Sequence, residues 1–137
     1  MPLDVNYWAV FIAGIVTLPF GALWYSPAIF GKKWMELIGM KPGDIQKAKK
    51  EATQGYVWTL VSALVMAYVL AHMVWYAQAG TLAEGFQVGF WLWLGFVVTT
   101  NLGSVLWEKK PFGVYLISMG FYLVSLLIMG GILATWR

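Results

Sequence analysis

The stretch GALWYSPAIFGKKWM, residues 21–35, closes the first of four long apolar runs and opens the largest polar loop of the chain. The four runs, residues 5–25, 56–78, 86–107 and 112–136, contain no Asp, Glu, Lys or Arg. Each is about as long as the roughly 20 residues that a helix needs to cross a hydrocarbon core of ~30 Å. Lipid offers the backbone no hydrogen bonds, and the runs do not alternate in polarity as membrane strands do. The sequence therefore predicts an all-α membrane protein: a single domain, residues 1–137, with four transmembrane helices in a compact bundle.

The composition supports this fold class and excludes several kinds of site and segment. The 137 residues are 61% hydrophobic and 11% charged, whereas about a quarter of the residues in a soluble domain are charged. Cysteine is absent, which excludes a disulfide framework, a thiolate metal site and a cysteine nucleophile. No Walker loop, zincin helix or serine triad is recognisable, so we expect no metal, no cofactor and no catalytic residue, and we do not expect an enzyme. The first run lacks the basic start and the small-x-small cleavage site of a secretory signal, so we expect a retained helix.

The basic residues indicate how the helices are oriented. Eight of the nine Lys and Arg residues lie in loop 26–55 or in the short loop 108–111, and Arg137 alone lies on the other side. The positive-inside rule places both loops in the cytoplasm and both termini outside, in a multi-pass protein of the inner (plasma) membrane. This clustering favours membrane topology over nucleic-acid binding. Four of the lysines are expected to contact anionic lipid headgroups: Lys32, Lys33, Lys109 and Lys110.

The loop that follows the first run contains a second periodic segment. The pair Ser26-Pro27 ends the first helix, because the residue before a proline is pushed out of the helical region. Large apolar residues then recur at helical spacing beside lysines, which predicts a short amphipathic helix in the membrane interface. The alternative is a loop anchored by Trp34. A turn at 41–44 follows, where Asp44 is expected to cap a polar helix at residues 45–54. The apolar residues of the amphipathic segment are Phe30, Trp34, Leu37 and Ile38.

Small residues at four-residue spacing mark three of the four runs. Such stripes allow another helix backbone to approach closely. They offer more contact surface than a single four-helix chain needs, so we expect a homo-oligomer, most simply a dimer. The stripes are Ala9, Ala13, Thr17 and Gly21 in the first run; Thr59, Ala63, Ala67 and Ala71 in the second; and Gly85, Gly89, Gly95, Thr99 and Gly103 in the third.

Two motifs resemble those of a bacterial membrane family known only as domain of unknown function seventeen-sixty-one. The second motif is LWEKK at 106–110 leading into 117–122, and the resemblance spans essentially the whole chain. It implies four membrane helices and a bacterial origin. It implies no activity, since the family is uncharacterised, so no catalytic residue is carried over. The first motif consists of Gly21, Trp24, Tyr25, Ser26, Pro27, Phe30, Gly31, Lys32, Trp34 and Met35; the second includes Ile117, Ser118, Gly120, Phe121 and Tyr122.

His72 is the one residue inside an apolar run that titrates near neutral pH in its ordinary state. An ionisable side chain within a membrane segment indicates a functional site. The alternative is an interfacial histidine that is hydrogen-bonded to a neighbouring backbone or hydroxyl group, because His72 lies only about two turns from the end of its run.

A polar patch lies deeper, in the third run. Thr99, Thr100 and Asn101 are consecutive, and we group Thr17 and Ser118 of other runs with them. Together with His72, these side chains are the candidates for a polar pathway or a ligand pocket. The alternative is that they form interhelical hydrogen bonds, each worth about 0.6–2 kcal/mol.

Three functions are compatible with these residues. The first is a small oligomeric channel or transporter for an ion or a small polar solute. The second is a non-catalytic membrane module that binds lipid, a hydrophobic small molecule or a partner protein through its Trp-rich cytoplasmic interface. The third, a membrane enzyme acting on a lipid, has little support, because no acid–base pair is placed to do the work.

Overall fold

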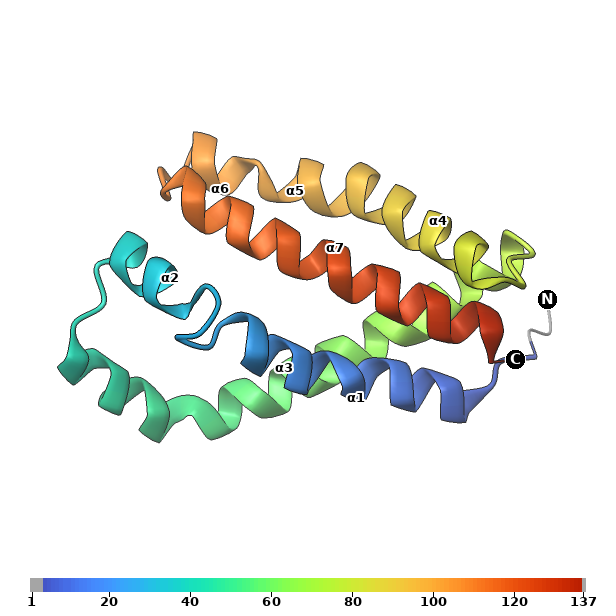
Figure 1. The fold of residues 1–137 in the computed structure, drawn as a ribbon, viewed down its shortest axis with the longest axis horizontal. Helices are drawn as coiled ribbons and strands as arrows, with labels where there is room; N and C mark the ends of the chain where they lie inside the picture. The colour runs from blue at the N-terminus through green and yellow to red at the C-terminus, as the bar shows by residue number, and fades with distance from the viewer. Residues whose placement is uncertain (1–3, 137) are drawn as a thin grey trace.

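The computed structural model describes residues 4–136, without the side chains of residues 42, 45, 46 and 48–51 (Figure 1). This part of the chain contains helices and connections but no β-strand, which confirms the predicted all-α class. The helices are α1 (Tyr7–Trp24), α2 (Gly31–Ile38), α3 (Pro42–Tyr76), α4 (Leu82–Leu92), the π-helix η1 (Trp93–Val98), α5 (Thr99–Asn101), α6 (Gly103–Leu106) and α7 (Phe112–Thr135).

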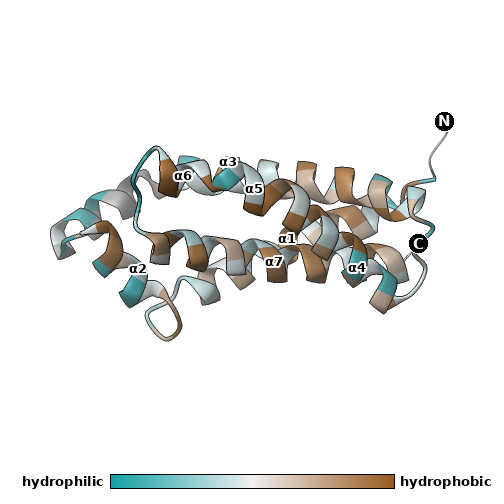
Figure 2. Ribbon diagram, turned by 90° about the horizontal axis from the view of Figure 1, so that it is seen from above, coloured by the Kyte–Doolittle hydropathy of each residue, from teal (hydrophilic) through white to brown (hydrophobic). Residues whose placement is uncertain are grey.

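Among the described residues, four helical stretches are long and apolar enough to cross a membrane: Tyr7–Trp24, Ala52–Tyr76, Leu82–Leu106 and Phe112–Thr135. They alternate in direction, so both termini lie at one end and α2 lies at the other (Figure 1). The α6–α7 connection, which carries Lys109 and Lys110, lies at the same end as α2 (Figure 1). Hydrophobic residues follow the long helices, whereas hydrophilic residues gather in α2 and the connections (Figure 2). Arg137, the one basic residue that the sequence places on the other side of the membrane, lies outside the described residues.

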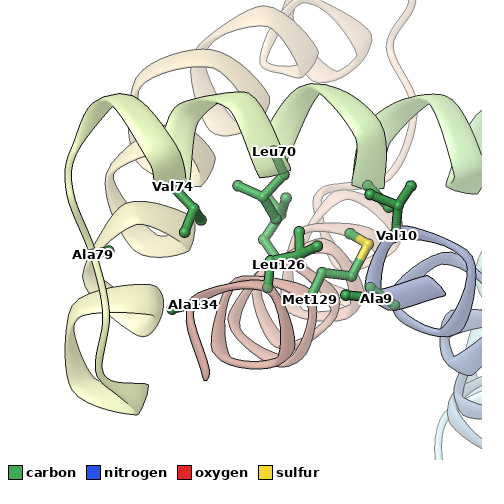
Figure 3. Close-up of a cluster of buried hydrophobic side chains, with 11 residues drawn as sticks. Ala9, Val10, Leu70, Val74, Ala79, Leu126, Met129 and Ala134 are labelled. Atoms are coloured by element: carbon green, nitrogen blue, oxygen red, sulfur yellow. The ribbon is translucent and has the colours of Figure 1, made fainter. Parts of the chain in front are cut away.

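Helix α7 lies at the centre of the packing and contacts each of the other long helical segments. Its side chains Leu126 and Met129 meet Leu70 and Val74 of α3 and Val10 of α1 (Figure 3). This cluster lies in the half of the molecule that holds the two termini. Toward the other end α3 extends beyond the end of α1 (Figure 1).

Several small residues of the first two runs pack between helices of the same chain. Ala9, Ala13 and Ala67 are 0% exposed, and Gly14 lies directly against α3. A Cβ atom on Gly14 would lie 3.3 Å from the backbone oxygen of Ala63. The stripes therefore serve contacts within one chain, where they bring α1 and α3 close together.

Glycines also set the distance between α4 and α7. A Cβ atom on Gly89 would overlap the backbone oxygen of Leu126, and one on Gly85 would overlap that of Gly130. No heavy atom outside its own helix backbone lies within 4 Å of a Cβ atom on Gly95. The close backbone contact between α4 and α7 thus depends on Gly85 and Gly89 and does not involve Gly95.

We expect Gly89→Ala to destabilise the bundle by about 1–3 kcal/mol, because the added methyl group forces α4 away from α7. The measurement is denaturant unfolding of the protein in detergent, followed by circular dichroism. The matched control is Gly95→Ala, which adds the same methyl group in open space and is expected to be neutral or slightly stabilising. Equal stability of the two variants would contradict the close approach.

The segment between the first two long helices differs in part from the prediction. The amphipathic helix is present as α2, so the loop alternative is wrong, and α2 ends at Gly39 with a φ of 72°. The polar helix expected at 45–54 is instead the start of one continuous helix, α3. The backbone N–H of Lys41 donates to a carboxylate oxygen of Asp44 at 3.1 Å, so the helix already begins at Pro42. Gly55 does not interrupt it, since a single glycine costs a helix only about 1 kcal/mol.

Candidate functional site

The turn after α1 docks the first motif onto α7. The indole N–H of Trp24 donates to the backbone oxygen of Ile117 at 3.0 Å. The hydroxyl of Tyr25 lies 3.5 Å from that of Ser118. Within the turn, the N–H of Gly31 donates to the oxygen of Ser26 at 2.9 Å, and a Cβ atom on Gly31 would collide with the backbone of residues 25 and 26. The turn therefore requires a glycine at this position.

Aromatic rings fill the space between the turn and α7. The ring centroids of Trp24 and Phe30 are 4.7 Å apart, and those of Tyr25 and Phe121 are 5.6 Å apart. A Cβ atom on Gly120 would lie 3.0 Å from the indole ring of Trp24, so glycine makes room for the ring. The residues of the two motifs therefore meet in space, and the aromatic cluster consists of Phe20, Trp24, Tyr25, Phe30, Trp34, Phe121 and Tyr122.

Both motifs lie within a region of the chain that matches a known protein family. The family described as protein of unknown function (DUF1761) matches residues 8–134. The chain belongs to the DUF1761 family. The match covers residues of all four long helical stretches and both motifs. Comparisons with curated proteins and with solved structures gave no match.

Beside the aromatic cluster, this DUF1761 chain has a groove of about 730 Å³ between α1, α3 and α7. Its volume lies within the roughly 300–1,000 Å³ of most small-molecule sites. The walls are mainly apolar, with hydroxyl groups, and no charged side chain lines the groove among the described residues. Its mouth includes exposed residues of α3. The lining includes Thr17, Gly21 and Tyr25 of α1; Tyr56, Trp58, Thr59, Ser62 and Met66 of α3; and Phe121, Tyr122, Ser125 and Met129 of α7.

Ser125 is the feature of this groove that packing does not explain. Its residue is 2% exposed, and its hydroxyl has no hydrogen-bond partner. A helical serine or threonine usually bonds back to a carbonyl three or four residues earlier. Thr17 does so to Gly14 at 2.6 Å, and Thr59 to Gly55 at 2.8 Å. An unpaired buried hydroxyl costs about 1–3 kcal/mol, so this one is expected to meet a partner from outside the chain.

The side chains of the predicted polar patch at 99–101 form hydrogen bonds to backbone carbonyls in and next to the π-helix η1. Thr99 donates to the oxygen of Gly95 at 2.6 Å, and Thr100 donates to that of Phe96. The amide N–H of Asn101 donates to Val97 at 2.8 Å. The next carbonyl, that of Val98, accepts the hydroxyl hydrogen of Tyr115 on α7 at 2.8 Å. Four successive carbonyls of the π-helical turn are thus bonded by side chains, as a segment within lipid requires.

His72 lies in the terminal half of α3, away from the groove. One of its ring nitrogens, Nδ1, is 2.8 Å from the backbone oxygen of Tyr68. Its ring also packs against the ring of Tyr68, with centroids 4.6 Å apart. This is the geometry of the alternative interpretation, a histidine bonded to a neighbouring backbone group, although its functional role stays a prediction.

The structure brings together only part of the predicted candidate set. Thr17 lines the groove, and Ser118 is linked to it through Tyr25. Thr99, Thr100, Asn101 and His72 do not line it. Burial raises the pKa of Tyr25, just beyond the first span, so its hydroxyl stays protonated at neutral pH. Within the described residues, no group of three or more His, Cys, Asp or Glu side chains is placed to hold a metal ion.

Sequence reasoning missed the residues that make the groove floor. The spacing of Tyr122, Ser125 and Met129 places them on one face of α7, which is a signal present in the sequence. The missing information was which helices face this side of α7. It could not be read from the small-residue stripes, because all three of them suit close packing equally well.

Proposed function

We propose that this chain is a non-catalytic membrane module that binds an apolar or amphipathic small molecule between α1, α3 and α7. The observation that carries the proposal is the unpartnered hydroxyl of Ser125 in a groove of about 730 Å³. Mostly apolar walls with a few polar groups are typical of small-molecule sites. A molecule that dissolves in the bilayer can enter through the exposed mouth without crossing water.

The test is photolabelling of the protein in nanodiscs with a diazirine-bearing hexadecyl probe, followed by peptide mapping. We expect labels on groove residues such as Met66 and Tyr122. We expect Ser125→Leu to reduce these labels at least about fivefold, because the larger side chain fills the floor of the site. The control is Ser104→Leu, the same change on α6, away from the groove. Equal labelling of Met66 and Tyr122 in wild type and Ser125→Leu would reject the proposal.

A channel or transporter is less favoured by the same residues. The donors of Thr99, Thr100 and Asn101 are spent on their own helix, and His72 lies away from them. If the chain nevertheless conducts a solute, flux into liposomes would fall on Asn101→Leu or His72→Phe. The binding proposal instead predicts that the protein gives no flux. It also predicts that Asn101→Leu and His72→Phe leave labelling of the groove unchanged.

We further propose that the protein is a homodimer in a bacterial inner membrane, with Lys32, Lys33, Lys109 and Lys110 near anionic headgroups. The third span, Leu82–Leu106, buries very little of its surface within one chain, which leaves a face for a second copy. A monomeric mass at all concentrations in mild detergent would reject the dimer.

The proposed orientation has a direct test, because the chain contains no cysteine. We expect a cysteine introduced by Gly80→Cys, between the second and third spans, to react with an impermeant maleimide in intact cells. A cysteine introduced by Lys109→Cys should react only after the cells are opened, since the lysine-rich loops are placed in the cytoplasm. The reverse pattern would invert the topology.

A further inference from the structure

The unpaired hydroxyl of Ser125 lies deep within the membrane span. Ser125 lies 13 positions after Phe112, the first residue of the 24-residue helix α7. At 1.5 Å per residue, its hydroxyl is about 20 Å along the helix and close to the middle of the span. The hydrocarbon core of a bilayer is ~30 Å thick, so a group at mid-span is about 15 Å from either interface.

This depth separates the candidate ligands. A phospholipid keeps its charged headgroup and ester oxygens at the interface, so it would place only methylene groups opposite Ser125. The hydroxyl would then remain unpaired, at its full cost. An occupant that satisfies Ser125 must instead carry a hydrogen-bonding oxygen into the hydrocarbon region, which requires an uncharged head.

The groove walls indicate the shape and polarity of that head. Aromatic rings of Tyr25, Phe121 and Tyr122 lie along one side, and such rings pack favourably against another flat ring. No charged side chain lines the groove among the described residues, which excludes strong binding of an ionic head. Ser125 has an unspent O–H, and an O–H needs an acceptor such as a carbonyl oxygen.

We propose that the groove binds a neutral, ring-bearing amphiphile with a carbonyl oxygen, such as a quinone with an apolar tail. This inference rests on the proposed function and adds the class of ligand. The carbonyl accepts the hydroxyl hydrogen of Ser125, the flat ring lies against Phe121 and Tyr122, and the tail leaves through the mouth at Thr59 and Ser62. The exposed positions of Thr59 and Ser62 allow the tail to continue into the bilayer.

The test uses the whole protein in nanodiscs with an azido-decylbenzoquinone photoprobe. Unlabelled decylbenzoquinone, decylphenol and phosphatidylglycerol are added as competitors. We expect the probe to label the groove, decylbenzoquinone to compete best, and phosphatidylglycerol to compete at least about tenfold more weakly. Ser125→Ala removes the hydroxyl but keeps the space, so it should weaken probe binding by about three- to tenfold. Ser104→Ala, the same change on α6 and outside the groove lining, should bind the probe as the wild type does.

The outcomes separate the two proposals. If the hexadecyl probe labels the groove but Ser125→Ala binds the quinone probe unchanged, the ligand class is wrong and the binding function stands. The same holds if phosphatidylglycerol competes as well as decylbenzoquinone. Stronger competition by decylphenol would overturn the carbonyl in favour of a hydroxyl. If neither photoprobe labels the groove, both proposals fail.

Discussion

Trp24→Ala should lower the free energy of unfolding by about 3 kcal/mol. The substitution removes the indole hydrogen bond to Ile117, the ring contact with Phe30 and the packing against Gly120. These contacts hold the turn after α1 on α7, so their loss frees both the turn and α2. The measurement is unfolding by a denaturing detergent, followed by circular dichroism and by tryptophan fluorescence.

The control for this prediction is another tryptophan at the same end of the molecule. Trp107 is 85% exposed, so Trp107→Ala should change the free energy of unfolding by no more than about 0.5 kcal/mol. If both variants lose the same stability, the effect would reflect interfacial tryptophans in general. The docking of the first motif onto the second would then not be what stabilises the fold.

The combined substitution Thr99→Val, Thr100→Val and Asn101→Leu should destabilise the protein by about 2 kcal/mol. It removes three hydrogen bonds to the carbonyls of η1, and such bonds within membranes average about 0.6 kcal/mol each, with larger values for some. Photolabelling of the groove should be unchanged, because none of these side chains lines it. Denaturant unfolding and probe labelling of the same preparation make the comparison.

The opposite pattern would assign the polar patch a different role. Unchanged stability together with lost solute flux or lost labelling would mean that residues 99–101 belong to a ligand path. Tyr115→Phe provides an independent check. It removes the bond to the fourth carbonyl of η1, from α7, and should also reduce stability without affecting the groove.

The fold class followed from the sequence because the apolar runs are much longer than a soluble protein needs. The amphipathic helix α2 was also predictable, since its aromatic and lysine residues alternate with helical spacing. Helix boundaries were less predictable where local hydrogen bonds, rather than charges, determine them. The first long helix begins at Tyr7, because the side chain of Asn6 accepts the N–H groups of Trp8 and Ala9. The third begins at Leu82, because Thr81 and Glu84 form a reciprocal capping box.

The candidate site was only partly predictable, for a physical reason. A hydroxyl or amide in a membrane helix can bond its own backbone, another helix or a ligand, and the residue type does not distinguish these outcomes. Asn101 bonds its own helix, Ser118 meets Tyr25, and Ser125 bonds nothing. The side chains at 99–101 bond to carbonyls of the π-helical turn. No spacing of apolar residues in the sequence indicates that this turn is present.

The most direct test of the account is native mass spectrometry of the protein released from its own membranes in a mild detergent. We predict a retained neutral amphiphile that is lost in Ser125→Leu and kept in Ser104→Leu. A wild-type protein that carries no molecule, or one whose bound molecule is equally retained in Ser125→Leu, would contradict the binding site between α1, α3 and α7.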